Sequence, residues 1–163
     1  MAQVNVTPKT VFTSPINFIA FGFGAGLSPW LPGTCGTLVA IPLYLLLAYL
    51  PWQLYLAVVL LSFIVGIWIC DKAEKAVGIP DYRGIVWDEI VGFWVTMFMI
   101  PPSWLLIAFG FVLFRFFDII KPWPINWLNT NLHGGFGIMV DDLLAAIISC
   151  GLLHMVLIVA KAS

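Results

Sequence analysis

Long apolar stretches, separated by short polar or proline-containing breaks, dominate the chain. Five apolar runs predict helices, at residues 38–50, 52–70, 84–100, 104–120 and 143–160. Pro51 separates the first two runs and Pro101-Pro102 the third from the fourth, because proline cannot continue a helix through its interior. Several runs approach the roughly 17–25 residues that a membrane-spanning helix needs. The pattern therefore predicts an all-α, polytopic membrane helix bundle with about five apolar helices.

The region before the first run differs from the rest. Residues 16–27 are apolar, but the segment is too short to span a bilayer and contains Gly22, Gly24 and Gly26, so we expect a short re-entrant or interfacial helix. Residues 1–14 are polar and are expected to form a flexible tail. The chain shows no internal repeat or low-complexity tract, and its 163 residues are enough for one compact unit, so residues 1–163 are interpreted as one domain.

Composition supports a membrane protein. Hydrophobic residues make up 62% of the chain and charged residues 9%, whereas soluble domains are about 25% charged. The net charge of −1 offers no general attraction to nucleic acid. Cys35, Cys70 and Cys150 show no CxxC or metal-ligand spacing, which favours free thiols.

Charged residues are distributed unevenly over the two sides of the predicted bundle. If the five runs cross the bilayer alternately, all acidic residues and most cations fall on one side. A bias of lysine and arginine marks the cytoplasmic side. A transporter would be expected to carry polar groups near the midplane, so this pattern favours a site at the cytoplasmic surface. The cations on that side are Lys72, Lys75, Arg83, Arg115 and Lys121.

The most informative stretch is residues 114–125, where charges interrupt an apolar run. Arg115 and Asp118 are three residues apart, so they share one face of a helix. Lys121 lies one step further, and Pro122 predicts the end of the helix. Asp118 is near a helix C-terminus, where the helix dipole opposes a negative charge. It therefore needs a cationic partner, which Arg115 or a metal ion could supply.

Two acidic pairs complete a candidate metal site. Asp88-Glu89 and Asp141-Asp142 stand at the predicted starts of the third and fifth runs, where carboxylates also serve simply as helix caps. Several carboxylates on one membrane face suit Mg²⁺, which prefers oxygen ligands together with substrate phosphate. The predicted ligands are Asp88, Glu89, Asp118, Asp141 and Asp142, and the predicted catalytic residues are Asp88, Asp118 and Asp141.

A small-residue segment, SPWLPGTCGT at residues 28–37, is the candidate phosphate cradle. It has turn composition and precedes a helix without an acid of its own, so exposed backbone N–H groups and the helix dipole would favour an anion. A plain turn with a threonine cap is the equally weighted alternative. The predicted phosphate-binding residues are Gly33, Thr34, Gly36, Thr37, Arg115 and Lys121. Together these features indicate phosphoryl chemistry on a lipid head group.

Four segments of the chain form a specific combination of motifs: GFGAGLSPWLPGTCGT (22–37), GIVWDEIVGFW (84–94), FRFFDIIKPWPI (114–125) and GGFGIMVDDLLAA (134–146). Together they resemble the phosphatidylglycerophosphatase A family of bacterial membrane lipid phosphatases. Thr37 stands where serine is usual in that family, and Phe93 where methionine is common. The resemblance implies Mg²⁺-dependent hydrolysis of phosphatidylglycerophosphate to phosphatidylglycerol in the bacterial inner membrane.

The roles of single residues stay open at this stage. The nucleophile is either water or one of the aspartates, with water the preferred hypothesis. One alternative function is a phosphatase for another lipid phosphate, of the polyprenyl or phosphatidate type. The other is a non-catalytic transporter or complex subunit whose charges only fix topology.

Overall fold

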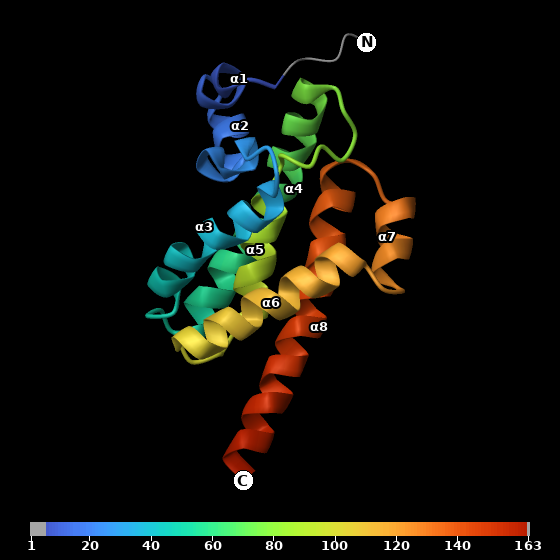
Figure 1. Ribbon diagram of the computed structural model, residues 1–163. Coiled ribbons are helices and arrows are strands. Elements are labelled where there is room, and N and C mark those ends of the chain that lie inside the picture. Colours follow the sequence, from blue (N-terminus) through green and yellow to red (C-terminus); the bar gives the residue numbers. More distant parts are fainter. Residues whose placement is uncertain (1–5, 163) are drawn as a thin grey trace.

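The fold is entirely helical over residues 6–162, the part of the chain that the computed structural model describes (Figure 1). This confirms the all-α prediction. The elements are α1 (Pro8–Phe12), α2 (Pro15–Ala20), the 3-10 helix η1 (Gly22–Leu27), α3 (Pro32–Leu47), α4 (Trp52–Val77), α5 (Trp87–Thr96), α6 (Trp104–Ile120), α7 (Ile125–Asn131) and α8 (Gly134–Ala162).

Helix α6 has the predicted bounds, and α4 and α8 extend beyond theirs. Helix α3 begins and ends earlier than predicted, and α5 covers only Trp87–Thr96 of the predicted run 84–100. Helix α3 begins at Pro32 rather than at residue 38, because proline is well suited to the first helical position. Helix α4 continues past Cys70 to Val77 and ends at Gly78, whose φ of 73° closes the helix in the left-handed conformation. Helix α8 begins at Gly134 rather than at residue 143.

The N-terminal region is more structured than the sequence predicted. Within the expected flexible tail, α1 is capped by the Thr7 side chain and buries Val11; residues 1–5 lie outside the described part. The apolar segment 16–27 forms two short helices, α2 and η1, with a break at Phe23 and Gly24, whose φ values are 59° and 100°. Neither helix is long enough to span a bilayer.

Two helices, α4 and α8, are long and apolar enough to cross a membrane. In their most apolar windows only 28% and 22% of the residues are buried, so these are not the buried core helices of a soluble protein. Helices α3 and α6 have 16 and 17 residues and α5 has 10, which is short for a span. The prediction of about five spans is therefore not confirmed, and two candidate spans are found among the described residues.

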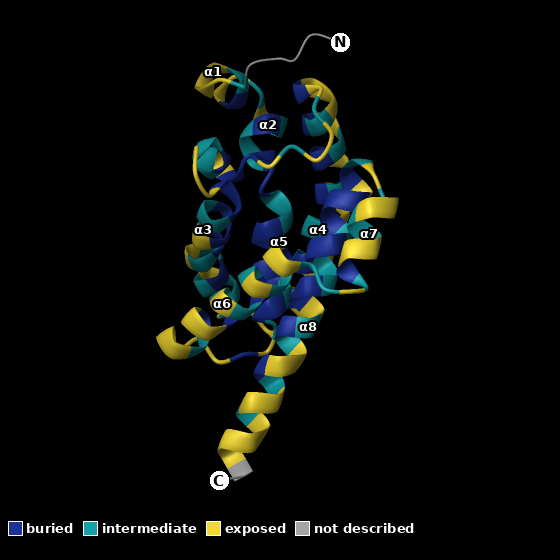
Figure 2. Ribbon diagram, turned by 45° about the vertical axis from the view of Figure 1, so that its right-hand side comes forward, coloured by how far each residue is buried: buried dark blue, intermediate teal, exposed yellow. Residues whose placement is uncertain are grey.

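Helix α5 lies at the centre of the bundle, packed between α3, α4, α6 and α8. Its Gly92 allows this close approach, because a Cβ there would lie 2.7 Å from the Phe114 ring. The C-terminal turns of α8 extend beyond the other helices and are exposed (Figure 2). The packing brings the beginnings of α3 and α5, the end of α6 and the first turns of α8 around one cavity; we call this the cavity end of the bundle.

Candidate active site

The cavity has a volume of about 390 Å³ and collects most of the charges predicted from sequence. Helices α5, α6 and α8 supply most of its acidic and basic side chains, the connection between α4 and α5 supplies the others, and the start of α3 also lines it. The charged residues that line it are Asp81, Arg83, Asp88, Glu89, Arg115, Asp118, Lys121, Asp141 and Asp142. The sequence prediction that the two acidic pairs, Arg115, Asp118 and Lys121 lie together is confirmed.

Three carboxylates, those of Asp88, Glu89 and Asp142, form an acidic centre. One oxygen from each lies within 4.8 Å of the other two. Ligand oxygens of one divalent ion lie within about 4–5 Å of one another, since each is about 2.0–2.6 Å from the ion. Asp88 Oδ1, Glu89 Oε2 and Asp142 Oδ2 are buried and have no hydrogen-bond partner among the residues that the structure describes. Such orphaned acceptors are costly, and the donor set fits a hard divalent cation such as Mg²⁺.

The pKa values of the two acids on α5, Asp88 and Glu89, are both raised, as expected for neighbouring carboxylates in a buried site. Burial raises the pKa of Asp88 well above its usual range, and the neighbouring Glu89 carboxylate raises it further. Burial, followed by the charge on Asp142, raises the pKa of Glu89 to about 8. Each anion disfavours the others in a buried site. A cation at this position would reverse the shifts by stabilising the ionised forms.

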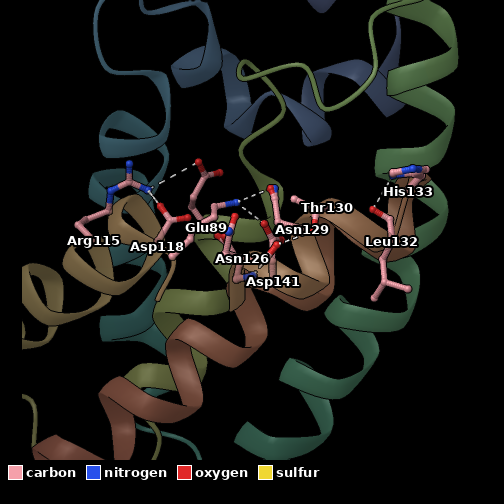
Figure 3. Close-up of polar contacts among 11 residues, drawn as sticks. Glu89, Arg115, Asp118, Asn126, Asn129, Thr130, Leu132, His133 and Asp141 are labelled. Carbon is pink, nitrogen blue, oxygen red and sulfur yellow. Dashed lines mark hydrogen bonds and ion pairs between the residues drawn. The ribbon is translucent and has the colours of Figure 1, made fainter. Parts of the chain in front are cut away.

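Arg115 and Lys121 also line the cavity, each beside a carboxylate. Arg115 forms an ion pair with Asp118 and lies 3.7 Å from Glu89, so these three side chains point toward one another (Figure 3). This confirms that Arg115 and Asp118 share a helix face. Lys121 pairs with Asp141 and donates to Asn129 Oδ1 at 3.3 Å. Lys121 has a φ of 44° at the end of α6.

The predicted phosphate cradle differs from expectation, because residues 32–37 are helical. Gly33 lines the cavity, whereas Thr34, Gly36 and Thr37 do not belong to its lining. A Cβ on Gly36 would lie 2.7 Å from Val86, so this glycine serves close packing. The buried Thr37 hydroxyl donates to the Gly33 carbonyl at 2.9 Å. Residues 32–37 are therefore not a loop as predicted, and of the four predicted cradle residues only Gly33 lines the cavity.

The Asp141-Asp142 pair also lies in a different context from the one predicted. Helix α8 begins at Gly134, so both acids sit about two turns inside the helix and not at its start. They are 5% and 3% exposed. The helix-cap interpretation does not apply to them, since the dipole effect fades within the first turn. Capping therefore does not explain why two buried carboxylates lie inside an apolar helix, and a role in the cavity does.

Several cavity residues were not found from the sequence. Asp81, Tyr82 and Arg83 reach it from the connection between α4 and α5, and Asn129 contacts Lys121 from α7. The sequence does not indicate that these polar residues, which lie in or near connecting segments, are close to the charged residues of α5, α6 and α8. His133, in the connection between α7 and α8, is exposed and lies beside the Leu132 carbonyl.

The fold and the cavity define an all-helical protein with a carboxylate-rich, cation-lined site at one end of an apolar bundle. The sequence profile of the family described as Phosphatidylglycerophosphatase A matches residues 18–157. The chain belongs to this family. The resemblance stated from the four sequence segments is thereby confirmed.

Relatives cover most of the chain. Phosphatidylglycerophosphatase A of Escherichia coli strain K12 is 48% identical over 145 residues, which are 88% of this chain and 84% of that protein. The Haemophilus influenzae protein of the same name is 43% identical over 149 residues, 90% of this chain and 91% of that protein. A Bacteroides thetaiotaomicron protein, provisionally named a phosphatidylinositol-3-phosphatase, is 43% identical over 141 residues, 80% of this chain and 86% of that protein. No solved structure matches the chain significantly.

Proposed function

We propose that this protein hydrolyses phosphatidylglycerophosphate to phosphatidylglycerol and phosphate, using Mg²⁺, at the cytoplasmic face of the bacterial inner membrane. The observation that supports it most is the acidic centre with its unpartnered, buried oxygens beside two cations in an open cavity. Family membership supports the same reaction. The arrangement suits a phosphate monoester, whose negative charge requires both a divalent ion and fixed cations.

The structural contacts support separate roles for the five predicted metal ligands. Asp88, Glu89 and Asp142 would hold Mg²⁺ through their unpartnered oxygens. Asp118 and Asp141 pair with Arg115 and Lys121, and we assign them the orientation of these cations toward the phosphate.

The phosphate would be held mainly by Arg115 and Lys121. Arg115 keeps a buried Nε–H without a partner, and a guanidinium can donate two parallel hydrogen bonds to a phosphate. Gly33, at the start of α3, lets the ligand approach because it has no side chain. Bound Mg²⁺ would neutralise phosphate oxygens and polarise the phosphorus toward attack.

Water is proposed as the nucleophile, with a carboxylate of the site accepting its proton. The new P–O bond forms as the bond to glycerol breaks, and the glycerol oxygen leaves with a proton as the free hydroxyl of phosphatidylglycerol. In a single turnover in ¹⁸O-water, we expect label in the released phosphate and none in the protein. Label in an aspartate carboxylate, detected by mass spectrometry of its peptide, would establish a phosphoaspartyl route instead.

The distribution of charge supports the proposed orientation. Lys72 and Lys75 near the end of α4 lie at the same end of the bundle as the cavity cations, while the exposed surfaces of α4 and α8 are apolar. With α4 and α8 crossing the bilayer as a multi-pass anchor, the positive-inside rule assigns the cavity end to the cytoplasm. The shorter helices α3, α5 and α6 would lie beside them within the membrane-embedded bundle.

A phosphoinositide is the second candidate substrate, because one relative is provisionally named for that activity. Polyprenyl and phosphatidate phosphates are the further alternatives from sequence. Purified protein should release phosphate fastest from phosphatidylglycerophosphate when offered all four lipids in detergent micelles. Faster release from phosphatidylinositol-3-phosphate would reassign the substrate, and release from none of them would favour a non-catalytic membrane subunit.

Removal of divalent cations is expected to abolish phosphate release, and added Mg²⁺ is expected to restore it. The reason is that the unpartnered oxygens of the acidic centre repel a phosphate when no cation lies between them. The measurement is phosphate release after treatment with a chelator and again after Mg²⁺ is supplied in excess. Full activity in the chelator would remove the metal from the mechanism.

A further inference from the structure

The cavity has an apolar edge that the proposed reaction does not explain. Trp30, Leu31 and Ile119 line the same cavity as the acidic centre. They are nevertheless 86%, 60% and 66% exposed. We call these three residues the apolar rim; two come from the segment that enters α3 and one from the last turn of α6.

The remainder of the cavity mouth is polar. Asp81 and Arg83, from the connection between α4 and α5, are exposed and line the same cavity. A smaller neighbouring pocket shares Asp81 and Asp141 with it and adds Glu74, Asn129 and His133. The exposed lining of the site therefore combines apolar and ionic side chains, which is the combination expected for a molecule with an ionic head and an apolar body.

The apolar surface continues away from the cavity along the end of α6. Ile120 and Trp123 follow Ile119 in sequence and are also exposed. Tryptophan is enriched where protein meets the membrane–water interface, since its ring is apolar and its N–H is polar. A surface of this kind, continuous with a charged cavity, matches the boundary between a phosphate head group and its lipid chains.

We propose that the apolar rim is the side from which the lipid substrate enters, and that it contacts the acyl chains next to the glycerol backbone. This inference rests on the proposed function. Because the chains stay on the rim and in the bilayer, only the phosphorylated head group has to enter the charged cavity. The rim thus recognises a phosphate attached to a membrane lipid and not a free sugar or glycerol phosphate.

The test compares two substrates with one head group. One is long-chain phosphatidylglycerophosphate in vesicles, and the other is its deacylated, water-soluble analogue, which has no acyl chains. The rim variants are Trp30→Gln and Leu31→Asn; Leu31 is the N-cap of α3, a position that accepts asparagine well. The controls are Trp104→Gln and Leu105→Asn, which are 73% and 79% exposed at the start of α6, the end far from Ile119.

Rim variants are expected to lower kcat/KM for the long-chain lipid at least about tenfold, with the soluble analogue unchanged within about twofold. The control variants should leave both substrates unchanged. Equal losses on both substrates would mean that the rim only supports the cavity, and no loss on the long-chain lipid would mean that the chains lie elsewhere; either result overturns the inference.

Two further results separate this inference from the proposed function. If wild-type protein hydrolyses both substrates and the rim variants behave like the controls, the function stands and the rim assignment fails. If wild-type protein hydrolyses neither, both fail. Thermal unfolding in detergent identifies a misfolded variant, and Trp30→Tyr, which keeps an aromatic ring, should then retain most activity on the long-chain lipid.

Discussion

Replacement of Asp88 or Asp142 by asparagine is expected to lower phosphate release by roughly 10³-fold, because several kcal/mol of charge stabilisation are lost with one ligand. Asparagine keeps the shape of the side chain, so membrane insertion and folding should persist. Folding should even become easier, since one of three mutually repelling carboxylates at the acidic centre is removed. Phosphate release and the Mg²⁺ affinity of the purified variants are the measurements.

Asp71→Asn is the matched control for these variants. Asp71 is a carboxylate near the same end of the bundle, but it pairs with Lys75 at 2.6 Å and does not line the cavity. Activity within about twofold of wild type is expected, because exposed ion pairs contribute little. Full activity in both Asp88→Asn and Asp142→Asn would remove the acidic centre from the mechanism.

A single methyl group on Gly33 is expected to cost about 100-fold in activity, the size of effect that a displacement of about 1 Å produces at a catalytic group. The Cβ of Gly33→Ala would overlap the Glu89 carboxylate and lie 3.0 Å from both terminal nitrogens of Arg115. Glu89, Arg115 or the start of α3 must therefore move. The measurement is kcat and KM for phosphatidylglycerophosphate, together with thermal unfolding in detergent.

Gly151→Ala provides the comparison, because a Cβ at Gly151 meets nothing within 4 Å. Alanine is the better helix former, so this variant should be as active and at least as stable as wild type. Equal activity of Gly33→Ala and Gly151→Ala would show that the start of α3 does not shape the site.

The part of the site that lies on one helix could be predicted from sequence. Helix α6 has its predicted bounds, because Pro101-Pro102 and Pro122 delimit an uninterrupted apolar run. Since Arg115 and Asp118 are separated by nearly one helical turn, their contact followed from periodicity alone. The alternation of the runs also placed the acidic pairs at the same end of the bundle, because antiparallel helices return their ends to one side.

The first residues of α3 and α8 could not be predicted as well as the bounds of α6. The interpretation of the predicted phosphate cradle and of the Asp141-Asp142 pair changed as a result. Glycine-rich segments at residues 33–36 and 134–137 have turn composition, yet both are helical. Their glycines permit close packing, as Gly36 does against Val86 and Gly135 does against the α4 backbone. Close packing stabilises these helix starts by more than the low helix propensity of glycine destabilises them. A single sequence does not reveal such tertiary contacts.

The apolar rim and the Asn129 contact were invisible to sequence analysis for another reason. Trp30 and Ile119 belong to segments that are far apart in the chain, and an exposed apolar residue in a membrane protein has no distinctive pattern. Asn129 approaches Lys121 only because α7 turns back beside α8. Three-dimensional proximity of this kind depends on the path of the connections, which composition does not specify.

Lys121 follows the last residue of α6 and adopts the left-handed backbone conformation. Glycine adopts this conformation without strain, whereas other residues are strained by about 1–2 kcal/mol. Despite this strain, the residue at this position is a lysine, whose ammonium group forms an ion pair with Asp141. Stability of the fold would therefore favour glycine at position 121, whereas the chemistry proposed for the cavity requires lysine. A sequence selected only for heat resistance would be expected to drift toward glycine here, and it would lose a cation from the cavity as it did so.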